Sequence, residues 1–223
     1  MKKLTHHLIS LFVLLSVTSL MAQDNTQLGL DIAKAQENNR EQLMTYSWQR
    51  SAKAFRNEEE KIHSLVKVWF DSEGEMESTV ISSQSSVKKQ PGVRGRMQAS
   101  EGQDLASLVE HSLGLSFQYV YLSKGNWIDL MDRAEVKIDE AIIALDTKDL
   151  LVKGDEVHFI MDNGNKLFKS ISLSSIVDAK AFTCSIEFKT MSDGTNHPSR
   201  TVIIFPSEGL KITAENIDYI KQQ

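Results

Sequence analysis

The residues best suited to covalent or metal chemistry are the single cysteine and the few histidines. Cys184 alternates with Phe182 and Ile186, which favours a buried and unreactive thiol. The histidines beyond residue 22 are His63, His111, His158 and His197. They lie far apart in the sequence and form no H-E-x-x-H motif. The sequence contains no G-x-S-x-G nucleophile elbow. We therefore predict no catalytic residue, no metal site and no cofactor.

The segment Asp162-Asn163-Gly164-Asn165 resembles the start of a calcium-binding loop. Its twelfth position, however, is Leu173, where such a loop carries a bidentate Glu. Asn-Gly between two apolar runs is common in hairpin turns. The segment is therefore interpreted as a turn.

Two groups of carboxylates could supply a general acid and a general base if they converged in a cleft. They are Glu73, Glu75 and Glu77, and Asp129, Asp132 and Glu135. Spacing along the chain does not establish convergence, and exposed acids are ordinarily solvated. A hydrolase using paired carboxylates is the third of three functional hypotheses.

Positive charge is concentrated near the middle of the chain, between Ser82 and Arg96. Pro91 and Gly92 predict a loop there. The cations that could contact an anionic group or an acidic partner are Lys88, Lys89, Arg94 and Arg96. A solvated loop without a binding role is the alternative interpretation.

Hydrophobic periodicity predicts an α+β domain. A helical period covers residues 24–44, and two further helices are expected from Ser100 and from Ser123, the latter ending near Arg133. Elsewhere apolar and polar residues alternate in roughly ten segments separated by turns. We predict a large curved antiparallel sheet, an incomplete barrel, covered by two to three helices.

The apolar faces of these helices could act as a lid over the concave face of the sheet. If the lid leaves space, the lining would bind a hydrophobic ligand; if it does not, the same residues are simply core. The candidate ligand-binding residues are Trp48, Phe70, Leu105, Leu108, Val109, Trp127 and Met131.

The N-terminus has the pattern of a secretory signal peptide. Lys2 and Lys3 precede an apolar run that ends near Leu20, and a polar stretch follows Ala22. The run is shorter than the roughly 20 residues that span a bilayer. We predict cleavage after Ala22, with Ser19 as the alternative site, which leaves residues 23–223 as one domain. The protein is expected in the periplasm, or else secreted, and is not expected to span the membrane after cleavage.

Charge and cysteine content narrow the partners further. Removing Lys2 and Lys3 changes the formal net charge of -5 to about -7, so nucleic acid is not an expected partner. A lone Cys184 excludes an intramolecular disulfide and a lipidated N-terminal cysteine. The stability of the domain must therefore come from its hydrophobic core.

Several short stretches resemble a family of uncharacterised exported bacterial proteins. They are Tyr46-Ser47-Trp48, the Lys88 to Arg96 segment, Asp193-Gly194-Thr195, Pro198-Ser199-Arg200-Thr201, and Glu215 to Tyr219. That family is similar in architecture to the LolA and LolB lipoprotein carriers, in which an incomplete antiparallel barrel closed by helices holds acyl chains. The resemblance implies a LolA-like fold and assigns no ligand residue.

The leading hypothesis is an exported, non-enzymatic protein that binds a hydrophobic or lipid-like ligand between sheet and lid. The alternative is a structural or partner-binding module in cell-envelope assembly, whose partner would be an envelope protein. The chain order of strands and helices favours the first hypothesis, and fold analogy alone does not decide between the two.

Overall fold

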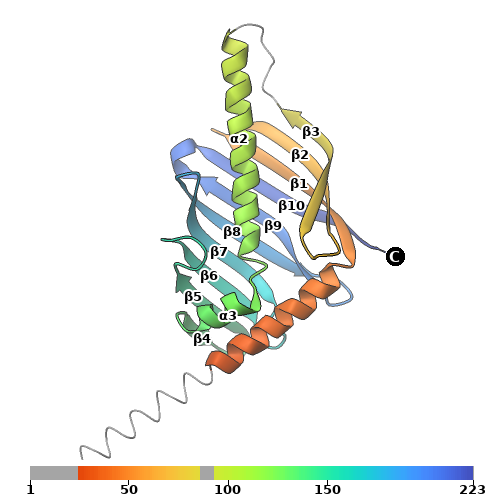
Figure 1. The fold of residues 1–223 in the computed structure, drawn as a ribbon, viewed down its shortest axis with the longest axis vertical. Coiled ribbons are helices and arrows are strands. Elements are labelled where there is room, and N and C mark those ends of the chain that lie inside the picture. The colour runs from red at the N-terminus through yellow and green to blue at the C-terminus, as the bar shows by residue number, and fades with distance from the viewer. Residues whose placement is uncertain (1–24, 86–92, 223) are drawn as a thin grey trace, which may run out of the picture.

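The computed structural model describes residues 25–85 and 93–222. Over these residues the chain forms one open antiparallel sheet of ten strands in the order β3-β2-β1-β10-β9-β8-β7-β6-β5-β4 (Figure 1). The strands are β1 (Tyr46–Arg56), β2 (Glu59–Phe70), β3 (Met76–Ser85), β4 (Glu135–Ile138), β5 (Ile142–Lys148), β6 (Glu156–Asp162), β7 (Phe168–Val177), β8 (Lys180–Thr190), β9 (Asn196–Phe205) and β10 (Leu210–Lys221).

Strand β1 pairs with β10, which joins the first and last strands of the chain in the middle of the sheet. Ala52 lies opposite Ala214, and Ala54 lies opposite Ile212. The two edges, β3 and β4, do not pair with each other, so the barrel is incomplete. The predicted fold class, an α+β incomplete barrel of about ten strands, is confirmed.

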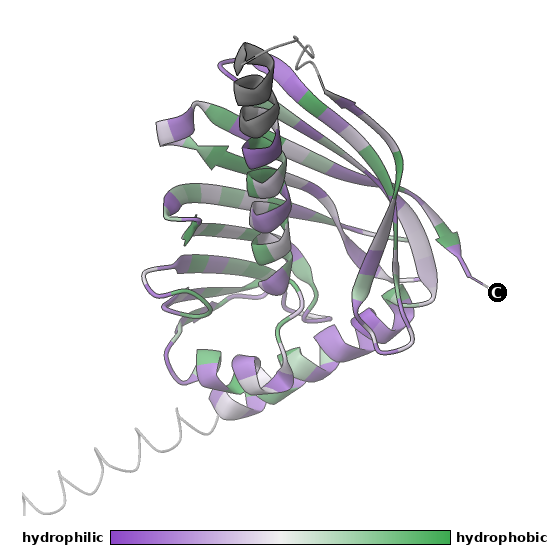
Figure 2. Cartoon of the chain, turned by 45° about the horizontal axis from the view of Figure 1, so that its top comes forward, coloured by the Kyte–Doolittle hydropathy of each residue, from purple (hydrophilic) through white to green (hydrophobic). Residues whose placement is uncertain are grey.

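The helices lie on one side of the sheet. Residues 25–43 form a helix along its lower rim, α2 (Val93–Gln118) crosses the concave face, and α3 (Lys124–Met131) lies near β4 (Figures 1 and 2). A 3-10 turn, η1 (Pro206–Glu208), links β9 to β10. None of the described helices is long and apolar enough to cross a membrane.

Two sequence predictions about α2 are wrong. The helix begins at Val93 instead of Ser100, and Arg94 and Arg96 therefore lie in its first turns instead of in a loop. Each residue added to an existing helix gains a hydrogen bond, so a strong downstream segment can extend back through Gly95, which costs only about 1 kcal/mol. The helix predicted from Ser123 is α3, and it ends at Met131. Ser123 is its N-cap and forms a capping box with Asn126.

The concave face carries the main hydrophobic core. Phe159, Ile171 and Ile186 are fully buried on neighbouring strands. Leu105, Leu108, Val109, Leu113 and Phe117 form the stripe of α2 that packs into the same core. Gly29 sits close to α3, since a Cβ atom there would lie 2.7 Å from Met131 Cγ. The core is thus shared by the sheet and all three helices.

Cys184 belongs to this core, as the alternation predicted. It is a buried free thiol. Burial raises the pKa of Cys184 to about 11, although a hydrogen bond with Ser116 of α2 opposes the rise. The thiolate that a nucleophile would need is therefore disfavoured.

A buried carboxylate organises the loop between β5 and β6. Asp155 is 0% exposed and accepts hydrogen bonds from the backbone N–H groups of Leu150 (2.7 Å), Leu151 (3.0 Å) and Val152 (2.9 Å). The Tyr119 hydroxyl, at the end of α2, donates a fourth at 2.6 Å. Burial raises the pKa of Asp155, but these four donors outweigh it, so the pKa lies below the usual value. This carboxylate joins α2 to the loop.

Replacing the buried carboxylate tests this connection. Asp155→Asn puts an amide among N–H donors, and we expect it to lower the free energy of unfolding by about 2 kcal/mol at pH 7. Because the native pKa lies below the unfolded value of about 3.9, the stabilisation is complete above that value and is lost as pH falls through the native pKa. Urea titrations should show the difference between wild type and variant shrinking between pH 5 and pH 2. A difference that does not depend on pH would contradict this assignment.

Candidate functional site

The predicted ligand-binding residues are all buried, but they lie in two separate clusters. Trp48 and Phe70 pack with Leu43 and Val68. The main core contains the others, which are Leu105, Leu108, Val109, Trp127 and Met131. None of the seven lines the most enclosed of the cavities found in the described residues. They fill space between sheet and helices, and their role as ligand contacts stays a prediction.

The predicted basic contact is only partly described. Lys88 and Lys89 lie outside the described residues. Arg94 and Arg96 belong to α2. A role in contacting an anionic group therefore stays a prediction for these four residues.

The predicted acids lie on the surface. Glu73, Glu75, Glu77, Asp129, Asp132 and Glu135 are all exposed. Glu135 borders an open hollow of about 920 Å³ on the outer face of β5 to β9. The acids that line this hollow have partners: Asp146 is hydrogen-bonded to His158 at 2.6 Å, and Glu156 and Glu135 form ion pairs with Lys148 at 2.5 Å and Lys137 at 2.9 Å. Exposed pairs of this kind contribute little to stability.

A more enclosed cavity of about 250 Å³ lies among helix 25–43, the connection between α2 and α3, and strands β7 to β9. Its apolar wall includes Leu43, Val120, Phe168 and Phe188. The Phe168 and Phe188 rings lie 5.0 Å apart. Its polar members are Gln36, Glu37, Asn39, Arg40, Ser123, Lys124 and Asn196. The cavity therefore combines an aromatic wall with a polar border that carries two cations, Arg40 and Lys124, and one carboxylate, Glu37.

The seating of helix 25–43 on the sheet forms this cavity. Asn39 Nδ2 donates to the Asn196 carbonyl at 2.8 Å, and the Asn196 N–H donates to Asn39 Oδ1 at 2.7 Å. A third contact runs from Gln36 Nε2 to the Lys166 carbonyl at 2.8 Å. These polar contacts hold the helix against β9 and against the turn between β6 and β7.

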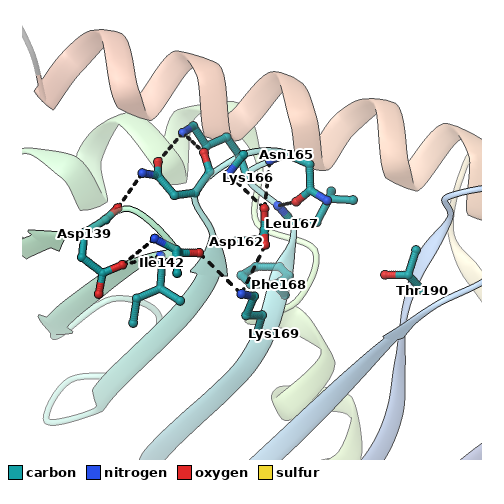
Figure 3. A network of polar contacts seen from close by, with 12 residues as sticks. Asp139, Ile142, Asp162, Asn165, Lys166, Leu167, Phe168, Lys169 and Thr190 are labelled. Carbon is teal, nitrogen blue, oxygen red and sulfur yellow. Dashed lines mark hydrogen bonds and ion pairs between the residues drawn. The ribbon is translucent and has the colours of Figure 1, made fainter.

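That turn is built around Asp162, as Figure 3 shows. Asp162 Oδ1 accepts from the N–H groups of Gly164 (2.9 Å) and Asn165 (3.2 Å), and Oδ2 lies 3.2 Å from Lys169 Nζ. Asn165 Oδ1 in turn accepts from the Leu167 N–H at 2.9 Å. The turn interpretation of this segment is confirmed, and the turn places Phe168 at the cavity wall.

Two residues that line the cavity each have a buried polar atom without a partner among the described residues. Arg40 Nε and Asn196 Oδ1 are buried without a hydrogen bond in the described structure. Arg40 uses Nη2 to donate to the Gly74 carbonyl at 2.6 Å. Buried polar groups are nearly always satisfied, and an exception calls for an explanation such as a bound group.

An aromatic cluster lies beside this cavity. Tyr121, which lines the cavity, packs edge-on against Phe70 with ring centroids 5.6 Å apart. Phe70 packs against Trp48 at 5.7 Å, and Trp48 stacks on Tyr219 at 5.4 Å and 15°. We name Trp48, Phe70, Tyr121 and Tyr219 the aromatic cluster. Arg50 of β1 reaches this cluster: its Nε shares Asn216 Oδ1 with Trp48 Nε1, and its guanidinium lies 4.1 Å from the centroid of Phe117.

Sequence reasoning missed Arg40, Arg50 and Asn196. The sequence does indicate the position of Arg50. It lies two residues from both Trp48 and Ala52 on one strand, so its side chain is on the same inward face as theirs. No local pattern indicates Asn196, whose partner Asn39 is 157 residues away.

Comparison with known proteins finds only remote structural matches. No family model and no curated protein matches the chain. A domain named for outer membrane lipoprotein sorting, from Vibrio parahaemolyticus, superposes with a TM-score of 0.44 at 10% identity, over 89% of this chain and 94% of that one. A LolA superfamily protein from Nitrosomonas europaea gives 0.39 at 10% identity, over 86% and 92%.

A DUF1329 family protein from Desulfovibrio piger gives 0.39 at 10% identity, over 88% of this chain and 92% of that one. At these TM-scores and sequence identities, no activity or ligand of those proteins can be assigned to this chain.

The Asn39–Asn196 contact is open to a matched test. Asn39→Ala removes both hydrogen bonds, so we expect the free energy of unfolding to fall by about 1–3 kcal/mol and amide exchange to rise across residues 25–43. Asn38→Ala, at an exposed neighbouring position of the same helix, is the control. Hydrogen-exchange mass spectrometry measures both variants. Equal exchange in the two would show that the contact does not seat the helix.

Proposed function

We propose that this is an exported, non-enzymatic protein that binds the apolar chain of an amphiphile in the cavity beneath helix 25–43. The cavity carries the proposal. Its volume of about 250 Å³ lies just under the roughly 300–1,000 Å³ typical of small-molecule sites, which suits one short chain. Phe168 and Phe188 supply the apolar contact.

The border of the cavity suits the polar end of such a ligand. Arg40, Lys124 and Asn196 stand at the same cavity as the aromatic wall. A few placed polar groups on an apolar lining are the usual composition of ligand sites, because they fix the orientation of a ligand held mainly by burial. The absence of an assigned catalytic group agrees with a binding role.

Export is the second part of the proposal. Residues 1–22 act as a cleaved signal peptide, and residues 23–223 form the single LolA-like domain in the periplasm. The lysines at the start, the apolar run and the polar stretch after Ala22 support this.

Filling the cavity should abolish binding. Ala33 is 4% exposed and lines the cavity, so Ala33→Leu places extra side-chain volume in the space a chain would occupy. We expect affinity for decanol, an uncharged single-chain amphiphile, to fall at least about tenfold, measured by isothermal titration calorimetry.

Ala106→Leu provides the control, because Ala106 is exposed on α2 and lies away from the cavity. It should bind decanol as the wild type does. Wild-type protein that binds no decanol, or an Ala33→Leu variant that binds it unchanged, would refute the proposed function.

Processing can be read from the mass of the protein. When the full chain is expressed with a bacterial export pathway, the periplasmic product should begin at Gln23. Ala22→Asp should block this cleavage, since the position before the cut needs a small residue. Intact-mass spectrometry distinguishes this product from cleavage after Ser19, and an uncleaved chain in the membrane fraction would contradict the assignment.

A further inference from the structure

Two cations lie inside the molecule without an acidic partner. Arg40 of helix 25–43 and Arg50 of β1 are both partly buried. Neither forms an ion pair with any carboxylate of the described residues, although the surface of the same chain carries many such pairs, Lys148–Glu156 among them. Taking a charge out of water is costly unless a counter-charge compensates it. The missing partner therefore needs an explanation.

The hydrogen bonds of the two guanidinium groups do not replace that partner. Arg50 Nε donates to Asn216 Oδ1 at 3.0 Å, but Trp48 Nε1 donates to the same oxygen at 3.1 Å. Arg50 Nη2 finds only Met76 Sδ at 3.4 Å, a weak acceptor. Arg40 has one good acceptor, the Gly74 carbonyl, and its Nε has none. Both groups retain donor capacity for an oxyanion.

Both cations also act on the same side chain. The Arg40 guanidinium lies 5.8 Å from the ring centroid of Tyr121 and 5.8 Å from that of Phe70. Burial raises the pKa of Tyr121 to about 12, and the charges of Arg50 and Arg40 both oppose that rise. Burial lowers the pKa of Arg50 to about 10, which leaves it protonated at neutral pH. Positive charge thus converges on the aromatic cluster from two elements.

Tyr121 connects this positive region to the cavity. It lines the cavity together with Arg40, while its ring packs on Phe70 in the aromatic cluster that Arg50 reaches. An amphiphile in the cavity with its polar end toward Tyr121 would bring that end to the guanidinium of Arg40. An anionic end would supply the missing counter-charge.

We propose that Arg40, which lines the cavity, binds the anionic headgroup, a carboxylate or a phosphate, of the amphiphile whose chain occupies the cavity. Arg50, whose charge acts on the same Tyr121 side chain, adds electrostatic attraction. This inference rests on the proposed function and adds the charge of the ligand to it. Guanidinium groups match both oxyanions geometrically, and charge-assisted hydrogen bonds are about twice as strong as neutral ones. The cation–π contacts with Phe117, Tyr121 and Phe70 hold the two side chains in place.

Calorimetry with matched ligands tests the charge preference. Wild-type protein should bind decanoate or decyl phosphate at least about tenfold more tightly than decanol. The tighter of the two anions identifies the headgroup chemistry. Inorganic phosphate should bind far more weakly than decyl phosphate, because it lacks the chain; equal binding would overturn the assignment to a headgroup.

Variants separate charge from packing. Arg40→Gln should lower affinity for the preferred anion about tenfold, and Arg50→Gln should lower it less; in both variants the loss should be larger for the anion than for decanol. Arg50→Lys keeps the charge and should retain part of the preference. Arg200→Gln, at an exposed position on β9, should change neither affinity. If Arg50→Gln does not fold, Arg40→Gln and the salt dependence of wild-type binding still test the proposal.

The outcomes distinguish this inference from the proposed function. Equal wild-type affinity for decanol and both anions, or an equal loss for all ligands in the Gln variants, would overturn the inference and leave the function intact. Failure of all ligands to bind wild-type protein would overturn both.

Discussion

The concave face of the sheet is apolar along its length and has to be covered. Alternation places Ile143, Phe159, Ile171, Ile186, Ile203 and Ile212 on this face, and all six are 0% exposed. Leaving such side chains in water would cost about 1.5–3 kcal/mol each. An open sheet cannot cover its own inner face, so α2, α3 and helix 25–43 must pack on it. The three helices therefore lie where they cover this apolar face. The cavity lies where helix 25–43 meets the rim of the sheet.

At the rim the core changes from apolar packing to polar contacts. Helix 25–43 contributes Ile32 and Leu43 to the buried clusters, and near the cavity it is joined to β9 by side-chain-to-backbone hydrogen bonds between Asn39 and Asn196. A helix held in this way can enclose a cavity without filling it. The same region holds Arg40 and, across Tyr121, Arg50. The centre of the fold thus provides stability, and the rim provides the cavity and the charge that could recognise a ligand.

The sequence predicted the sheet better than the site. Strict alternation along strands such as β8 identified the strands, and Ser123, predicted as the N-cap, located the start of α3. The start of α2 was missed because propagation of a long helix carries it past the local signal at Ser100. The apolar residues predicted as ligand contacts are buried in two hydrophobic clusters, and nothing in a sequence tells a filled concavity from an empty one. The cavity depends on contacts between residues 157 positions apart, which no local pattern encodes.

The central claim is that an anionic amphiphile occupies the cavity with its headgroup at Arg40. A crystal structure of the protein saturated with ω-bromodecanoate tests it most directly, because anomalous scattering locates the bromine at the end of the chain. The account predicts one bromine peak among Phe168, Phe188 and Val120, with the carboxylate within hydrogen-bond reach of the Arg40 guanidinium. A bromine peak only in the outer hollow near His158, with the cavity free of ligand, would contradict it.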